Sequence, residues 1–187
     1  MIKAILDACT LYAAPLRDFL LRLAENELFY PFWSEEIQNE WIRNLLRNRP
    51  DLKPESLERT RRNMDTRFPN SLVQGYESLI PTLHLPDLND QHVLAAAIHA
   101  KAESIVTFNL ADFPQSVLQF YGIEALSPDE LVLRLIQKRQ NRVIVTIKNH
   151  RSLLIRPSFL ANEYLAMLAK QGLPKMVALL LEHESDL

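Results

Sequence analysis

Apolar residues along this chain occur in two alternating patterns over roughly the first two thirds of its length. Short apolar runs, which are typical of strands buried on both faces, are IKAIL, ELFYPFW, SIVTF and IEAL. The segments between them repeat apolar residues at helical spacing, as in LYAAPLRDFLLRLAEN. Pro31 is expected to shorten the second run. Strands that alternate with helices predict an α/β fold, a three-layer α/β/α sandwich around a parallel sheet.

Several helix boundaries follow from capping and breaking residues. Ser34 is expected to cap a helix that runs to about Arg47, with two glutamates in its first turn. Proline residues delimit a second, basic helix within residues 54–68. Further helices are expected near SLVQGYESLI, from about Asp90 to Ala102 and, as a short helix, in QSVLQFYG; LADFP is expected to be a turn.

The pattern after residue 126 is helical to the end of the chain. Ser127 is expected to cap the first helix of this part, and Gly172 with Pro174 is expected to separate two helices. We therefore divide the chain into an α/β domain, residues 1–126, and a C-terminal all-helical extension, residues 127–187.

The composition is that of a globular protein, because 48% of the residues are hydrophobic and 24% are charged. A chain of 187 residues is long enough to form a complete hydrophobic core. Cys9 is the single cysteine, so no internal disulfide forms and a cytoplasmic location is expected. The first twenty residues contain Asp7, Arg17 and Asp18, which argues against a signal peptide or a membrane span.

Charge is distributed unevenly although the net charge is only −2. Residues 68–133 are strongly acidic, whereas residues 43–67 and 134–156 are rich in lysine and arginine. An acidic centre flanked by basic segments suits a polyanion that is cut at an acidic metal site. Solvated helix faces are the simpler interpretation of the same charges.

Carboxylates from four distant segments are expected to meet at one edge of the sheet. In open parallel sheets, ligands bind beyond the carboxyl ends of the strands. Asp7 ends the first strand, Asp112 and Asn109 follow SIVTF, and Asp90 opens the helix that leads into that strand. Glu40 lies at the border of the apolar face of its helix. Glu36, one turn earlier, is the alternative to Glu40, although first-turn glutamates commonly support the helix dipole.

Asp90 lies at the start of the row of apolar residues that should face the core along its helix, and an unpaired charge in the core is costly. A capping role is one explanation, with Asp87 as N-cap and Asp90 in the first turn. A bound cation is the other, because clustered carboxylates repel one another unless a cation neutralises them. Oxygen ligands suit Mg²⁺ or Mn²⁺, and a metal in such a pocket can activate water for attack on a phosphate.

The blocks ILDACTLY, NEW, DQHVLAAAI and IVTFNLADF resemble the signature segments of PIN-domain ribonucleases, particularly VapC-type toxins. The blocks span residues 1 to about 126, and the extension resembles that of a longer VapC-like subgroup. This resemblance implies a metal-dependent endoribonuclease with one or two Mg²⁺ or Mn²⁺ ions, acting on RNA. It also implies a small antitoxin partner, a homodimer and no association with membranes.

By the same resemblance, the metal ligands and catalytic residues are Asp7, Glu40, Asp90 and Asp112. Thr107 and Asn109 are their polar neighbours, and Asp87 adds a carboxylate whose role the family pattern leaves open. Cys9 stands close to where many relatives have a small hydroxyl residue, which Thr10 is a candidate to replace. Asp112 can also be read as an ordinary turn residue.

Other residues have simpler interpretations. Trp33 and Trp41 are expected in the core, and Cys9 is expected to pack rather than to act as a nucleophile. His92 and His99 are expected at the surface, because they point away from Asp90 around the helix.

Two other functions remain open. One is a catalytically silent PIN-like module that binds RNA or protein. The other is a phosphatase of the haloacid dehalogenase type, which needs a second aspartate where Cys9 stands. For the antitoxin, an arginine or lysine near Asp7 and Asp90 is expected, with a helix docked against residues 34–47 and 54–68.

Overall fold

A computed structural model of the chain describes residues 1–155 and 158–181, and a five-stranded parallel sheet lies at its centre. The strand order is β3-β2-β1-β4-β5. The strands are β1 (Ile2–Leu6), β2 (Phe29–Ser34), β3 (Leu72–Val73), β4 (Ser104–Val106) and β5 (Glu124–Leu126). All four apolar runs form strands, so these predictions are confirmed.

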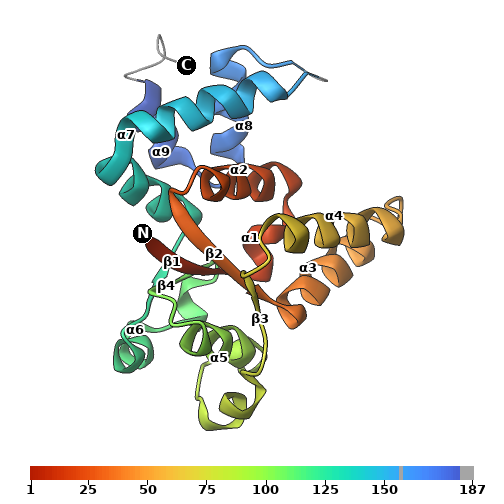
Figure 1. The fold of residues 1–187 in the computed structure, drawn as a ribbon, viewed down its shortest axis with the longest axis vertical. Coiled ribbons are helices and arrows are strands. Elements are labelled where there is room, and N and C mark those ends of the chain that lie inside the picture. Colours follow the sequence, from red (N-terminus) through yellow and green to blue (C-terminus); the bar gives the residue numbers. More distant parts are fainter. Residues whose placement is uncertain (156–157, 182–187) are drawn as a thin grey trace.

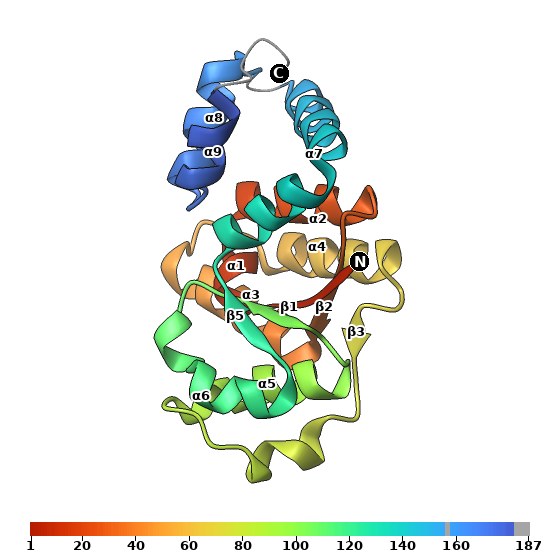
Figure 2. The ribbon, with the colours of Figure 1, turned by 90° about the vertical axis from the view of Figure 1, so that its left-hand side faces the viewer.

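Helices cover both faces of this sheet. On one side lie α1 (Ala8–Tyr12), α2 (Ala14–Glu25), α3 (Glu35–Asn48) and α4 (Pro54–Arg67) (Figure 1). On the other lie α5 (Gln91–His99) and α6 (Gln115–Leu118), as Figure 2 shows. The predicted three-layer α/β/α sandwich is confirmed. Trp33 and Trp41 are both fully buried, as expected.

Pro31 lies inside β2 without interrupting the sheet. It stands opposite Ala4 of β1, whereas β3 pairs only with Trp33 and Ser34 on the other side of β2. The missing proline N–H therefore falls where β3 no longer runs alongside, which is the kind of position that strand prolines tolerate.

The predicted caps are present in the structure. The Ser34 hydroxyl accepts a hydrogen bond from the Ile37 N–H, and α3 starts directly after it. Ser127 and Glu130 form a reciprocal capping box at the start of α7 (Pro128–Leu153).

The helix predicted near SLVQGYESLI is wrong. Leu72 and Val73 pair with β2, and a short 3₁₀ helix, η1 (Glu77–Thr82), follows. Gly75 lies between them with φ of +79°, a left-handed conformation that ends any continuous helix at this point. The remaining 3₁₀ turns are η2 (Leu88–Asp90), η3 (Leu110–Asp112) and η4 (Gln119–Tyr121).

The C-terminal extension packs on the sandwich through α7, which contacts α2 and β5. Beyond α7 lie α8 (Ala161–Lys170) and α9 (Pro174–Leu181), separated at Gly172 as predicted. The expectation that the pattern is helical to the end of the chain is wrong in one segment, because Leu154 to Leu160 are not helical where they are described. Arg139 also kinks α7. The end of the predicted helical pattern, residues 182–187, lies outside the described residues. Among the described helices, none has the length and hydropathy needed to cross a membrane.

Candidate functional site

Asp7 lies at the carboxyl end of β1, where the chain leaves the sheet and α1 begins. Its side chain is almost completely buried, with 4% exposed, and three groups donate to its oxygens. The Ala8 N–H donates to Oδ1 at 2.6 Å, while the Thr107 hydroxyl at 2.7 Å and the Cys9 thiol at 3.1 Å donate to Oδ2. The carboxylate is therefore held in one orientation at the end of the central strand.

The pKa of Asp7 is raised above its ordinary value. Burial is the main cause, because removal from water disfavours the charged form, and the negative charge of Glu40 adds to it. The hydrogen bonds from Thr107, Cys9 and Ala8 act in the opposite direction. Glu40 is therefore near enough to Asp7 to affect its ionisation.

Asp90 ends η2 and directly precedes α5, a helix in which Val93 to Ala97 are fully buried. Its side chain does not cap α5, whereas Asp87 accepts from the Asn89 N–H at 2.8 Å and caps η2. The pKa of Asp90 is raised to about 7, first by burial and then by the charges of Asp7, Asp87, Asp112 and Glu40. Asp87, and not Asp90, is therefore the capping residue. Asp90 and the other four carboxylates lie near enough to one another for their charges to raise the pKa of Asp90.

Glu40 joins this environment from α3. After burial, the charge of Glu40 contributes to the raised pKa values of both Asp7 and Asp90. Glu36 is exposed, and its charge contributes instead to the raised pKa of Tyr76, after burial of that side chain. The structure thus places Glu40, and not Glu36, beside the other acids.

The prediction of a surface position for His92 is wrong. Only 12% of its side chain is exposed, and its Nε2 lies 3.6 Å from Oε2 of Glu40. The helical wheel correctly turned His92 away from Asp90, but it contained no information that Glu40 of α3 lies beside His92. His99 is exposed, as expected.

The polar neighbours lie around the loop that follows β4. Thr107 is fully buried against Asp7, and its Oγ1 also accepts from the Asn109 N–H at 3.0 Å. The side chains of Asn109 and Asp87 are exposed, and Asp112 is partly buried in η3. The Thr10 hydroxyl donates to the backbone oxygen of Asp7, so Cys9 and Thr107, rather than Thr10, contact the carboxylate.

A family model for the PIN domain matches residues 3–111, which include Asp7, Glu40 and Asp90 and more than half of the chain. The chain belongs to the PIN-domain family. A second model, the VapC50 C-terminal domain, matches residues 128–182 of the extension. The resemblance to VapC-type PIN proteins with a C-terminal extension is thereby confirmed.

One curated relative is "Putative ribonuclease VapC50" of Mycobacterium tuberculosis (strain ATCC 25618 / H37Rv). It is 36% identical over 110 residues, which cover 57% of this chain and 64% of the relative. The matched part therefore spans less than two thirds of that relative's length. The search of solved structures gave no match.

The carboxylates of this PIN domain offer hard oxygen donors, which is the ligand chemistry that Mg²⁺ and Mn²⁺ prefer. In the described residues, no three His, Cys, Asp or Glu side chains converge tightly enough to enclose an ion as they stand. Asp90 is the group that best fits a cation, because the neighbouring carboxylates repel its negative charge and its side chain does not cap the helix. The donor set thus suits a hard divalent cation, and the side chains need to move inward to enclose it.

The Cys9 thiol has a pKa raised to about 12 by burial and by the charge of Asp7. Such a thiol stays protonated near neutral pH, which agrees with the prediction that Cys9 is not a nucleophile.

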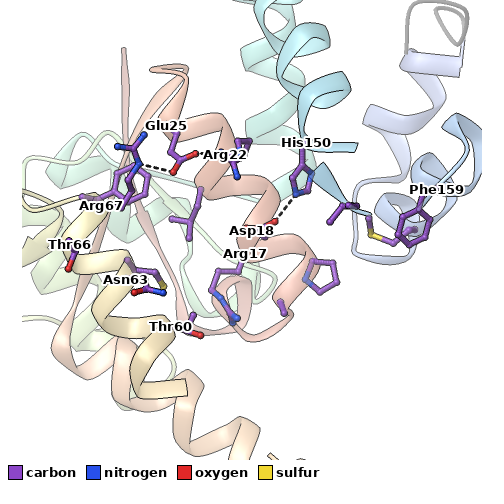
Figure 3. Close-up of a pocket in the computed structure, with 17 residues that line it drawn as sticks. Arg17, Asp18, Arg22, Glu25, Thr60, Asn63, Thr66, Arg67, His150 and Phe159 are labelled. Atoms are coloured by element: carbon purple, nitrogen blue, oxygen red, sulfur yellow. Dashed lines mark hydrogen bonds and ion pairs between the residues drawn. The ribbon is translucent and has the colours of Figure 1, made fainter. Parts of the chain in front are cut away.

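A cavity of about 1010 Å³ lies between the PIN domain and its extension (Figure 3). Residues of α2, α4, α7 and α8 line it, and none of the four candidate acids does. At its wall the buried His150 accepts or donates at both ring nitrogens, to Tyr164 Oη at 2.6 Å and to Asp18 Oδ2 at 2.8 Å. This cluster joins α7 and α8 of the extension to α2.

Proposed function

We propose that this PIN domain is a divalent-metal-dependent endoribonuclease that hydrolyses RNA, and that it is the toxin of a toxin–antitoxin pair. The observation that carries this proposal is the environment of Asp90, whose pKa is raised to about 7 first by burial and then by the charges of four neighbouring carboxylates. A cluster of this kind is costly in the free protein and favourable only around a cation. The similarity to a relative that is named as a ribonuclease supports the same conclusion.

Asp7, Glu40, Asp90 and Asp112 are the residues that would hold Mg²⁺ or Mn²⁺, one or two ions per site. A bound cation of this type supplies a Lewis acid that activates water and neutralises charge on the attacked phosphate. Thr107 and Cys9 fix the Asp7 carboxylate through its Oδ2. Asp90 carries no helix cap and is therefore free to turn toward a cation. No protein nucleophile is required.

The RNA backbone is proposed to bind along α3, on the side that carries Glu40. Arg43 and Arg47 follow Glu40 at helical spacing of three and seven residues, so the three side chains share one face, and both arginines are exposed. Several other arginines in the basic segments form internal ion pairs, namely Arg49, Arg61, Arg67, Arg134 and Arg142. Arg156, the last residue of the second basic segment, lies outside the described residues.

The partner is proposed to be a small antitoxin that binds in the cavity of Figure 3. Of the two helices expected to form its groove, α4 lines this cavity and α3 does not. The proposed antitoxin also places a basic side chain near Asp7 and Asp90.

We further propose a cytoplasmic location, a homodimer and the division of the chain into residues 1–126 and 127–187.

The test is RNA cleavage by purified protein in Mn²⁺, in Mg²⁺ and in EDTA, with Asp7→Asn and Asp90→Asn as variants. We expect cleavage in either metal, none in EDTA and none with either variant, although both variants fold and melt in EDTA at or above the wild-type temperature. RNA binding without any metal-dependent cleavage would instead identify a non-catalytic binding module.

A further inference from the structure

The turn between α8 and α9 lies against the loop that follows β4, through Gly172 and Phe108. A Cβ atom at Gly172 would lie 2.6 Å from Cε1 and 2.9 Å from Cζ of Phe108. Side-chain carbons do not approach one another so closely, so the Phe108 ring occupies the space that any side chain at position 172 would need. Gly172 also has φ of +89°, a conformation that favours glycine.

Phe108 belongs to the segment that holds the Asp7 carboxylate. Its N–H donates to the Cys9 sulfur at 3.2 Å, and the Cys9 thiol donates to Asp7 Oδ2. The preceding residue, Thr107, donates directly to the same oxygen. A displacement that reaches the Phe108 backbone therefore moves both groups that contact Oδ2 of Asp7.

The α8–α9 turn is itself held in place by α7. Asp129, in the first turn of α7, is buried and accepts from the N–H groups of Lys175 at 2.9 Å and Met176 at 2.8 Å, at the start of α9. Helix α7 follows β5 directly, and the Leu126 oxygen of β5 accepts from the Thr107 N–H at 2.9 Å. The turn and the loop are thus anchored to the same end of the sheet.

We propose that the contact of Phe108 with Gly172 is a positioning contact, through which the C-terminal extension sets the orientation of the Asp7 carboxylate. Phe108 and Gly172 act through Thr107 and Cys9, and they need not touch the substrate. This inference rests on the proposed function for its consequence in catalysis, whereas the contact itself can be tested without it. The extension is then part of the nuclease site rather than an appendage to it.

The test compares Gly172→Ala with Gly122→Ala in the full chain. Gly122 is a matched control, since it also has positive φ, +67°, but a Cβ there would meet nothing within 4 Å. Three quantities are measured: the dissociation constant for Mn²⁺ by electron paramagnetic resonance, kcat and KM for RNA cleavage, and the rate of reaction of the single cysteine with DTNB. The thiol rate reports on the Phe108–Cys9 contact and is independent of cleavage.

For Gly172→Ala we expect Mn²⁺ affinity to fall about fivefold and kcat about tenfold, because small displacements at a site are costly, with KM within about twofold. The thiol rate should rise about threefold, since the Phe108 N–H no longer donates to the Cys9 sulfur in the same geometry. Gly122→Ala should leave all of these within about twofold, because it adds backbone strain alone.

A Phe108→Ala background separates the two possible causes of a Gly172→Ala effect. There the Gly172→Ala substitution should have no further effect on Mn²⁺ affinity or on the thiol rate, because the ring with which the new methyl group collides is absent. A full Gly172→Ala effect in that background, or equal behaviour of Gly172→Ala and Gly122→Ala, would overturn the proposal. If the wild type neither binds Mn²⁺ nor cleaves RNA, the proposed function fails, and the thiol rates alone decide whether the contact positions Cys9.

Discussion

Asp90 illustrates how one residue can violate the pattern of its own helix for a functional reason. Val93 to Ala97 of α5 are buried and apolar, yet Asp90, which precedes this helix, is an acid with a pKa raised to about 7 and without a capping role. The sequence revealed this conflict, because the helical stripe could be counted from Asp90 onward. It could not reveal how far burial and the surrounding charges raise the pKa of Asp90, since Asp7, Glu40 and Asp112 come from segments more than twenty residues away.

The raised pKa of Asp90 predicts a pH dependence of stability in the metal-free protein. The folded state binds the Asp90 proton more tightly than the unfolded chain, in which the pKa is near 3.8. The resulting stabilisation is complete below about pH 4 and is lost as the pH rises through about 7. In EDTA, the melting temperature of wild type relative to Asp90→Asn should therefore fall between pH 5 and pH 8. Glu36→Gln should keep the wild-type dependence, and a difference that does not change with pH would contradict this reasoning.

Thr107 is expected to stabilise the fold through its hydrogen bond to Asp7. Thr107→Val keeps the shape of the side chain but removes the donor at 2.7 Å from a buried carboxylate. We expect the free energy of unfolding to fall by about 2 kcal/mol, as for other bonds to charged groups. Thr146→Val is the control, because that hydroxyl donates to the Arg142 carbonyl within α7 and its loss should cost less than about 0.5 kcal/mol. Urea denaturation distinguishes the two, and equal losses would remove this role from Thr107.

At the scale of elements, apolar runs and caps predicted the strands and the starts of α3 and α7 because these signals are local. The predictions failed where distant contacts decide the structure. Leu72 and Val73 form a strand because β2 offers a free edge, and His92 lies beside Glu40, which comes from the distant helix α3. No pattern within either segment contains that information.

Helix α3 carries the prediction for RNA binding. Arg43→Gln together with Arg47→Gln should raise KM for RNA about tenfold and leave kcat within about twofold, because these arginines bind phosphates rather than reacting groups. The dependence of KM on salt should also become shallower. Arg62→Gln, an exposed substitution on α4, should change KM by less than about twofold. Equal effects of the α3 and α4 substitutions would place the RNA elsewhere.

At the scale of the whole molecule, the gathering of the four acids is a prediction from topology, because the carboxyl ends of parallel strands share one edge of a sheet. The sequence did not predict the arrangement of the extension. The contacts of α7 with α2, of Gly172 with Phe108 and of His150 with Asp18 each join residues that are far apart in the chain. The cavity of Figure 3 exists only because the extension closes over α2 and α4.

This cavity predicts where an antitoxin binds. Leu21→Arg, in α2 at the cavity wall, should abolish copurification with the product of the neighbouring gene, because it places a charge in an apolar contact. The purified variant should still cleave RNA. Val145→Arg is the control, since Val145 is exposed on α7 and does not line the cavity. If the partner binds Leu21→Arg as it binds wild type, it occupies a different surface.

The most direct test of the central claim, that an acidic cation site hydrolyses RNA, is the chemistry of the cut ends. Wild-type protein and Asp90→Asn are incubated with RNA in Mn²⁺, and the termini of the products are identified by their susceptibility to ligation and phosphatase. Because activated water rather than the ribose 2′-hydroxyl attacks the phosphate, we expect 5′-phosphate and 3′-hydroxyl ends with wild type and no cleavage with Asp90→Asn. Products that end in a 2′,3′-cyclic phosphate, or cleavage that continues in EDTA, would contradict the account.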